Sequence, residues 1–492
     1  MSEAPGSGRA ILKASVWLFA ALSMLASLSP LGATHDEAYH ARSIWCGQGE
    51  RSPYCTERFT DTTGQPVART NIETQNCQIP VNQPLLCPTD RTGESIFRTN
   101  DGLYPSLFYY VLSWFVVPNV SVSTFLIRLV SIFIISTLFG ITMWLLPPRY
   151  RLVLLLVSLT TFTSTGFFLF SSLNPSSWTS LGTGIGWLSI HAAFGKSPLS
   201  RTRRVALGIT GSLAWVMALG SRWDAVPFLV FVSYLIALHL LQLHHPRRRT
   251  QLLLFGLLIP IISISLLERF APARIVFDVR RLYSYSPGQP DNLTFFTDNL
   301  MQGLPNALRA LGSVPVMSGI VIPEIVYISA LGLLGMFVFR TFNQSQPLQI
   351  FGVLSAAVVI CIVIAAQVAL VDNRDTGGVE PRYVYPLFIF MVAWWFLLGP
   401  DDLRKKVQQY LRPGAIVVTT LFALVAFTTT ERFVDRTTFG LRYLPEGPDQ
   451  WWWSWMPFGP NVAVILAPVF IWWYFRELFE TLNHYELSDH ES

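Results

Sequence analysis

The sequence predicts an all-α integral membrane protein of about 12 transmembrane helices, and two observations lead to this fold class. Of the 492 residues, 51% are hydrophobic and only 13% are charged, a balance far from that of soluble domains. Apolar runs of roughly the 17–25 residues that a helix needs to cross a bilayer recur along the chain, separated by short polar loops. The expected segments are 11–31, 121–146, 152–172, 176–194, 205–220, 225–243, 251–267, 325–341, 350–370, 384–399, 414–429 and 461–476.

The whole chain, 1–492, is expected to form a single polytopic membrane domain. The first segment is interpreted as a retained helix, because a cleaved signal peptide would be followed by a polar mature domain. The stretch "LYPSLFYYVLSWFVV" at 103–117 is too short to span comfortably and is expected to lie at the membrane interface. The longer connections are an outer loop at 32–120, further outer loops at 268–324 and 430–460, and a cytoplasmic tail at 477–492.

The placement of basic residues predicts the orientation. With the N-terminus inside, every lysine falls on the cytoplasmic side, as do the arginine-rich clusters at 149–151, 201–204 and 247–249. Short cytoplasmic loops are enriched in Lys and Arg, so this partition favours a multi-pass topology with both termini cytoplasmic. The lysines are Lys13, Lys196, Lys405 and Lys406. The formal charge of +5 is what such anchoring leaves behind, and it requires no nucleic-acid partner.

The cysteines agree with this orientation. Cys46, Cys55, Cys77 and Cys87 all lie in the first outer loop, where an oxidising compartment favours disulfides. Two bridges are expected; three connectivities are open, and the short intervals favour pairing 46 with 55 and 77 with 87. A zinc site is the alternative, although no CxxC pair occurs. Cys361 is expected to be free within an apolar helix.

Polar residues of unusual position gather at the outer ends of the expected helices. Ionisable groups near membrane depth are costly, and they usually mark a binding site or a pathway. Four separate loops therefore offer functional groups to one outer surface. These residues are His35, Asp36, Glu37 and His40 after the first segment, Asn174 in "SSLNPSSW", Arg222 and Asp224 in "GSRWDA", and Glu380 and Arg382 in "GGVEPRYVYP".

Each of these residues also has a structural explanation. Arg222 and Asp224 could simply pair with each other, and Arg382 could extend to phospholipid headgroups. Asn174 could cap the helix that follows it, and the histidines of 35–40 could be solvated loop residues. The adjacent carboxylates are the hardest to explain structurally, because they repel unless something uses them.

A helix beginning after Asp36 would place Asp36 and His40 on one face, four residues apart. That geometry suits a base oriented by an imidazole, or two ligands of a divalent metal. Neither use is specific, since the spacing matches no strong metal motif such as HExxH. No cofactor is assigned from the sequence, and a divalent metal on Asp36 and His40 is kept as an alternative.

The sequence "THDEAYHARSIWCG" resembles the PDExxH-type motif of the domain-of-unknown-function 2142 family of bacterial polytopic membrane proteins, with His35 where proline is usual. The blocks "NPSS" at 174–177, "SRWDA" at 221–225 and "EPRYVYP" at 380–386 resemble further blocks of that family, in the same order. In the last block Pro381 stands where that family usually has glycine.

That family is in turn similar to the GT-C membrane glycosyltransferases, whose donor is a sugar on a polyprenyl phosphate. In those enzymes an acidic motif follows the first helix, and an interfacial helix comes after it, which "LYPSLFYY" at 103–110 resembles. The resemblance implies that Asp36 is the general base and Glu37 its neighbour in an acidic pair. It also implies that Arg222 or Arg382 holds the lipid phosphate.

The resemblance implies a glycosyltransferase of the bacterial plasma membrane that moves a hexosyl or pentosyl group to an acceptor in the cell envelope. Its partners would be a lipid-linked sugar donor, membrane lipids and a glycan or lipid acceptor. Two other functions are open: a transporter or flippase of an envelope precursor, and a non-catalytic assembly protein. A transporter would favour inverted repeats and broken midplane helices, and no convincing internal repeat is found.

Overall fold

The structure is a computed structural model of the chain. It describes residues 7–29, 36–48, 51, 55–60, 66–72, 92–98, 104–162, 164–244, 324–342, 345–370, 381–400, 402–433, 453 and 455–489, and all statements below concern these residues. The expected segment 251–267 and the site candidates His35 and Glu380 lie outside them.

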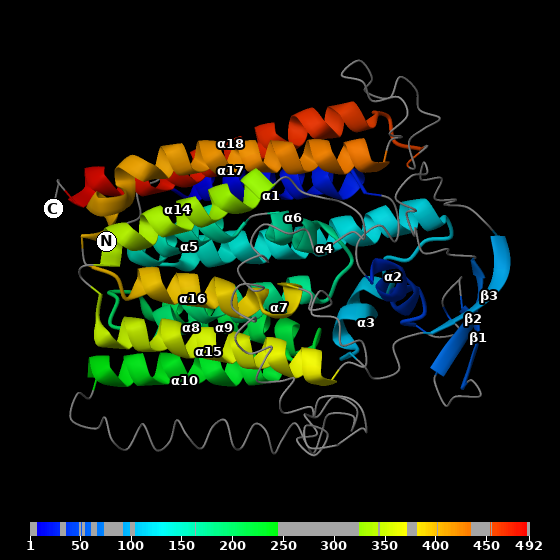
Figure 1. Cartoon of the computed structure of the whole chain (residues 1–492), viewed down its shortest axis with the longest axis horizontal. Helices are drawn as coiled ribbons and strands as arrows, with labels where there is room; N and C mark the ends of the chain where they lie inside the picture. The colour runs from blue at the N-terminus through cyan, green and yellow to red at the C-terminus, as the bar shows by residue number, and fades with distance from the viewer. Residues whose placement is uncertain are drawn as a thin grey trace, which may run out of the picture.

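The body of the protein is a bundle of helices that run side by side (Figure 1). Every expected apolar segment within the described residues coincides with one helix or with two or three consecutive helical elements. The helices are α1 Ser7–Ser27, α4 Val120–Leu145, α5 Pro148–Thr161, α6 Ser164–Ser171, α7 Ser176–Leu181, a π-helical stretch Gly182–Gly186, α8 Trp187–Phe194, α9 Arg201–Leu219, α10 Ala225–His244, α14 Glu324–Phe342, α15 Pro347–Leu370, α16 Tyr385–Leu397, α17 Leu403–Phe433 and α18 Pro460–Asp489.

Among the described residues, five helices are long and apolar enough to cross a membrane. The pair α5 and α6, bent by 100°, would make a sixth span. Shorter apolar helices occur at Ile328–Phe342, Pro347–Val363 and Tyr385–Leu397. A multi-pass helical membrane protein is confirmed, whereas the total of about twelve spans stays a prediction. The five spans are Gly8–Ser27, Val120–Leu145, Ala225–Leu243, Leu403–Thr428 and Pro460–Thr481.

A small layer of structure lies beyond one end of the bundle (Figure 1, right). It contains helices α2 Glu37–Trp45 and α3 Leu107–Ser113 and the strands β1 Cys55–Thr60, β2 Pro66–Ile72 and β3 Thr92–Arg98. The strands form an antiparallel sheet in the order β1-β2-β3. The sheet is not expected from the sequence, which predicts only helices. The expected bridge between Cys46 and Cys55 is present and ties the end of α2 to β1, with Cα atoms 5.6 Å apart.

Of the expectations for the other cysteines, one is confirmed and one is untested. Cys361 is free on α15, as expected. Cys77 and Cys87 lie outside the described residues, so their pairing stays a prediction.

The stretch 103–117 contains a helix, α3, that is shorter than the stretch. Its expected interfacial position stays a prediction. α3 buries Phe108 and Leu112, one helical turn apart, while Tyr110 is 51% exposed. The backbone N–H of Phe108 donates to the carbonyl of Gly220 at 3.1 Å, which fixes α3 to the end of α9. This amphipathic placement at the end of the bundle agrees with an interfacial position.

The opposite end of the bundle is basic. Arg149 donates to the carbonyl of Leu397 at 2.9 Å, and Arg203 donates to the carbonyl of Trp144 at 2.9 Å. These arginines satisfy carbonyls at the C-terminal ends of α16 and α4, where a helix leaves acceptors without intrahelical donors. The fold thus separates the anchoring charges from α2 and α3. Assigning this end to the cytoplasm stays a prediction.

Candidate functional site

Asp36 occupies an unusual backbone position directly before α2. Its φ of 58° makes it the one non-glycine residue with positive φ among the described residues. Aspartate tolerates this left-handed conformation better than most residues. The carbonyl of Asp36 accepts the first helical bond, from the N–H of His40 at 2.9 Å. Its carboxylate does not cap α2, and the side chain is 38% exposed.

The carboxylate of Asp36 forms an ion pair with Nη2 of Arg382, from the 3₁₀ turn Pro381–Tyr383 that precedes α16. The two residues are 346 positions apart in sequence. Arg382 is buried, and its guanidinium lies 5.2 Å from the ring centre of Tyr383. The first and last of the polar blocks recognised in the sequence therefore meet.

Arg222 lies in the connection between α9 and α10 and approaches the same tyrosine. Its guanidinium lies 4.6 Å from the ring centre of Tyr383 and 5.4 Å from that of Tyr104. Nε and Nη2 of Arg222 donate to the Asp224 carboxylate at 2.9 and 2.7 Å, and Nη1 donates to Ser176 Oγ at 3.1 Å. Tyr383 is thus within cation–π distance of two guanidiniums.

Electrostatics keep Arg222 charged in spite of its burial. Burial opposes the charged form, but Asp224 and the neighbouring tyrosines outweigh it, so the pKa of Arg222 is raised above its ordinary value. Burial also raises the pKa of Tyr104, although the Arg222 guanidinium works against this rise. Tyr104 is therefore a neutral phenol beside a fixed cation at neutral pH.

His40 belongs to an aromatic group beside these charges. Its Nδ1 lies 2.9 Å from the hydroxyl of Tyr109, and its ring centre lies 5.2 Å from that of Tyr104. Burial, reinforced by Tyr104, raises the pKa of Tyr109 well above its ordinary value. His40 on α2 thus connects α3 to the site through Tyr109.

Glu37 adjoins Asp36 in sequence and has the opposite environment. Its side chain is 0% exposed, and its two oxygens accept from Nε and Nη2 of Arg128 at 2.8 and 2.6 Å. The N–H of Leu173 donates to the same carboxylate at 3.2 Å. Arg128 also donates to the carbonyls of Ala26 and Ser29, at the end of α1, at 2.7 and 2.6 Å. The Glu37–Arg128 pair therefore joins α1, α2 and α4.

Asn174 has a local function in the turn before α7. Its Oδ1 accepts from the N–H of Ser176 at 3.0 Å, and its carbonyl accepts from the hydroxyl of Ser177 at 2.7 Å. These bonds order the turn, in agreement with the capping alternative, and they place Ser176 where Arg222 contacts it. Asn174 therefore acts on the site indirectly, by positioning Ser176.

The metal alternative does not fit the residues present. Within the described parts of the chain, no three His, Cys, Asp or Glu side chains lie close enough to hold a metal ion. The carboxylate of Asp36 is paired with Arg382, and Nδ1 of His40 is hydrogen-bonded to Tyr109. The two side chains thus have different partners, and no chemical step is derived through a metal.

Three contributors to this end of the bundle are missed by sequence reasoning: Arg128, Tyr104 and Trp453. Arg128 is detectable in principle, because it is the one charge in the 26 residues of α4 and an intramembrane charge needs a partner. Tyr104 lies in the stretch "LYPSLFYY" at 103–110. Nothing in that stretch indicates that Tyr104 lies beside Arg222. Trp453 is fully buried, donates to the carbonyl of Ser27 at 2.8 Å, and has its ring centre 5.6 Å from the Arg128 guanidinium.

Comparison with known proteins identifies the family. Residues 18–285, more than half of the chain, match the family described as predicted membrane protein (DUF2142). The chain belongs to this family. The matched region contains Asp36, Arg222 and Asp224, while the Arg382 block lies beyond it. No curated protein and no solved structure matches the chain.

The chemical capacity of the site follows from these contacts. Two guanidiniums lie within 5.2 Å of the ring centre of Tyr383, and a partly exposed carboxylate is paired with one of them. Arginine presents a planar set of donors that suits phosphate, and a carboxylate accepts protons. The site can bind an anion beside a candidate base.

Proposed function

We propose that this protein is a GT-C-like glycosyltransferase that moves a sugar from a polyprenyl phosphate to an acceptor in the cell envelope. The observation that carries the proposal is the convergence of Asp36, Arg382 and Arg222 around Tyr383 at one end of the bundle. The site would lie on the extracytoplasmic side of a bacterial plasma membrane, where a lipid-linked donor replaces nucleotide sugars.

The proposed reaction is an inverting transfer. The acceptor hydroxyl oxygen attacks the anomeric carbon, and the bond between that carbon and the phosphate oxygen breaks. The hydroxyl proton passes to the carboxylate of Asp36, and polyprenyl phosphate leaves with the bonding electrons. General-base assistance of this kind contributes typically about 10²–10⁴-fold.

The Asp36–Arg382 ion pair suggests that donor binding comes before activation of the acceptor. In the absence of donor, the guanidinium of Arg382 neutralises Asp36. An incoming phosphate competes for Arg382 and releases the carboxylate to face the acceptor. The partial exposure of Asp36 supports this exchange, because a fully buried pair would resist separation. Arg222 is held by Asp224 and Ser176, so it contributes a fixed positive field.

The environments of the two carboxylates favour Asp36 over Glu37 as the base. Both oxygens of Glu37 are occupied by Arg128, and the side chain has no exposed surface. A base must reach the acceptor, directly or through one water. Glu37 is accordingly assigned a structural function beside the base.

The alternative of a non-catalytic assembly protein is supported by the same ion pairs. Asp36 and Arg222 each already have an oppositely charged partner, and a structural network needs no more than that. The transporter alternative has weaker support, because the Asp36, Arg222 and Arg382 cluster lies at helix ends rather than at the middle of the bundle.

The test is release of polyprenyl phosphate from a panel of lipid-linked sugars by the full chain in liposomes. Asp36→Asn should reduce turnover by about 10²-fold or more, because the amide cannot accept the proton. Asparagine tolerates the left-handed conformation of this position, and its amide oxygen can still accept from Arg382. Because the substitution removes the negative charge beside a buried guanidinium, thermal unfolding of the variant is measured alongside turnover. Lys405→Gln at the other end of the bundle is the matched control and should keep wild-type turnover.

Two outcomes would contradict the proposal. If Asp36→Asn kept wild-type turnover, Asp36 would not be the general base. Absence of release from every donor by the wild-type chain, with binding of acceptor or partner proteins intact, would favour the assembly alternative.

A further inference from the structure

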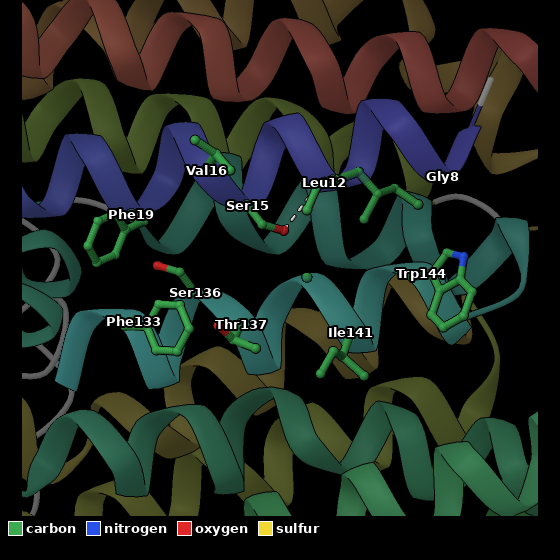
Figure 2. Close-up of a pocket in the computed structure, with 12 residues that line it drawn as sticks. Gly8, Leu12, Ser15, Val16, Phe19, Phe133, Ser136, Thr137, Ile141 and Trp144 are labelled. Atoms are coloured by element: carbon green, nitrogen blue, oxygen red, sulfur yellow. Dashed lines mark hydrogen bonds between the residues drawn. The ribbon is translucent and has the colours of Figure 1, made fainter. Parts of the chain in front are cut away.

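A groove runs between α1 and α4 on the side of the bundle, away from the candidate site. Its volume is about 400 Å³, and its rims are formed by Leu12 and Val16 of α1 and by Ile141 and Trp144 of α4. Figure 2 shows the two helices on either side of the groove with these side chains along it. Both walls belong to helices long and apolar enough to cross the membrane.

The rim side chains are exposed in a way that suits lipid. Leu12 is 67% exposed and Trp144 is 50% exposed. On a membrane-spanning helix such apolar side chains face hydrocarbon. The groove is therefore open to the bilayer.

The length of the groove matches one leaflet. The lining of α1 runs from Gly8 to Phe19 and that of α4 from Phe133 to Trp144, in each case about 16 Å at the helical rise. The hydrocarbon core of a bilayer is about 30 Å thick, so one leaflet contributes about half of it. Phe19 and Phe133 meet edge to face, with ring centres 6.2 Å apart, at the inner end of the groove. A chain entering from the other end would stop near the bilayer centre.

The width of the groove suits a single chain. Ser15 and Gly140 lie so close that a Cβ on Gly140 would collide with the Ser15 hydroxyl, so α1 and α4 touch at the floor. A helix with its side chains is about 10 Å across and could contact only the rims. A single alkyl chain can lie between the rims, against the Ser15–Gly140 contact at the bottom of the groove.

The open end of the groove carries positive charge. Arg203 donates to the carbonyl of Trp144 at 2.9 Å, and the exposed Arg9 follows Gly8. The first turns of α1 and α9 contain no acidic residue. An anionic headgroup is attracted to such a cluster by about 1 kcal/mol per basic residue.

We propose that this groove binds an anionic phospholipid from the leaflet at the basic end. One acyl chain lies between α1 and α4 and ends at Phe19 and Phe133, and the phosphate lies near Arg9 and Arg203. This lipid site is separate from the proposed glycosyltransferase site and does not depend on it.

The test is native mass spectrometry of the full chain, titrated with phosphatidylglycerol or with phosphatidylcholine of the same acyl chains. The wild-type chain should retain one phosphatidylglycerol in preference to phosphatidylcholine. Thr137→Trp fills the groove from an exposed position and should abolish this retention. Ile209→Trp, at an exposed position of α9, is the matched control and should not.

The headgroup contact has its own pair of variants. Arg9→Glu should weaken binding of phosphatidylglycerol about tenfold, whereas Lys405→Glu, an equal charge change at the same end of the bundle, should leave it unchanged. Equal binding of the two phospholipids, equal loss in Thr137→Trp and Ile209→Trp, or preference for a polyprenyl phosphate over phosphatidylglycerol would overturn the proposal. A dimer that Thr137→Trp dissociates would assign the groove to a second copy instead.

Discussion

The two ends of the helical bundle use arginine in different ways. Toward the basic end, Arg149, Arg203 and Arg204 donate to backbone carbonyls, whereas Arg476 forms an exposed pair with Glu480 one turn along α18. At the other end, each of three arginines holds a carboxylate. These pairs are Arg128–Glu37, Arg222–Asp224 and Arg382–Asp36.

The difference shows which positive charges are available for chemistry. A backbone carbonyl neither leaves nor changes its protonation state, so an arginine bound to it is a fixed anchor. A carboxylate can be displaced by a competing anion, and the ease of displacement depends on its burial. Glu37 is fully buried while Asp36 is partly exposed. Among the three pairs, Arg382–Asp36 thus combines a buried guanidinium with the most exposed carboxylate.

Removal of Arg128 should have the largest effect on stability. Arg128→Ala leaves the Glu37 carboxylate buried without its partner, which should cost about 3–5 kcal/mol of folding stability. Thermal unfolding of the purified protein in detergent measures the loss. The double variant Arg128→Met with Glu37→Gln removes both charges and should recover part of the stability. A thermal midpoint of Arg128→Ala equal to that of the wild type would show that the pair does not hold α1, α2 and α4 together.

Removal of Arg382 should affect donor binding more than stability. Arg382→Ala deletes charge-assisted hydrogen bonds worth about 1.5–3 kcal/mol, which corresponds to a rise of roughly 10- to 150-fold in the Kd for a polyprenyl phosphate. Fluorescence titration with a labelled polyprenyl phosphate measures this. Unchanged affinity would place the phosphate elsewhere, with Arg222 the next candidate.

Of the three arginine substitutions, removal of Arg203 should have the smallest effect on stability and on donor binding. Arg203→Gln loses hydrogen bonds to the carbonyls of Trp144 and Leu145 and should cost about 1 kcal/mol of stability. The Kd for a polyprenyl phosphate should stay at the wild-type value in the same titration. A donor-binding defect as large as that of Arg382→Ala would remove the distinction between the two ends.

The helical part of the fold was predictable because apolar length determines it. The expected segment 121–146 and α4 agree within one residue at each end. The 100° bend between α5 and α6 was missed, although the polar run "SLTTFTSTG" at 158–166 interrupts the apolar segment at the break. The run indicates a weak point in the helix, whereas the size of the bend depends on tertiary packing. The sheet was also missed, because β-propensity depends strongly on context and strands of six or seven residues give only a weak local pattern.

The candidate site was predictable in location and only partly in pairing. The Arg222–Asp224 pair is one of the structural alternatives given by the sequence, and it is present. The predicted topology places Asp36, Arg222 and Arg382 at helix ends on one side of the membrane, so their proximity follows from the direction of each helix. The choice of partners does not follow from topology, since Asp36 pairs with a residue 346 positions away. The division between Asp36 and Glu37 depends on the left-handed backbone at Asp36 and on Arg128, and neither is visible in the local sequence.

A cryo-electron microscopy structure of the full chain with a polyprenyl phosphate bound would show directly whether Arg382 holds the phosphate beside Asp36. We predict phosphate density within hydrogen-bonding distance of the Arg382 guanidinium, with the Asp36 carboxylate separated from Arg382 and facing the open side of the site. Glu37 and Arg128 should remain paired in the same map. Phosphate bound away from both Arg382 and Arg222, with the Asp36–Arg382 pair intact, would contradict the account.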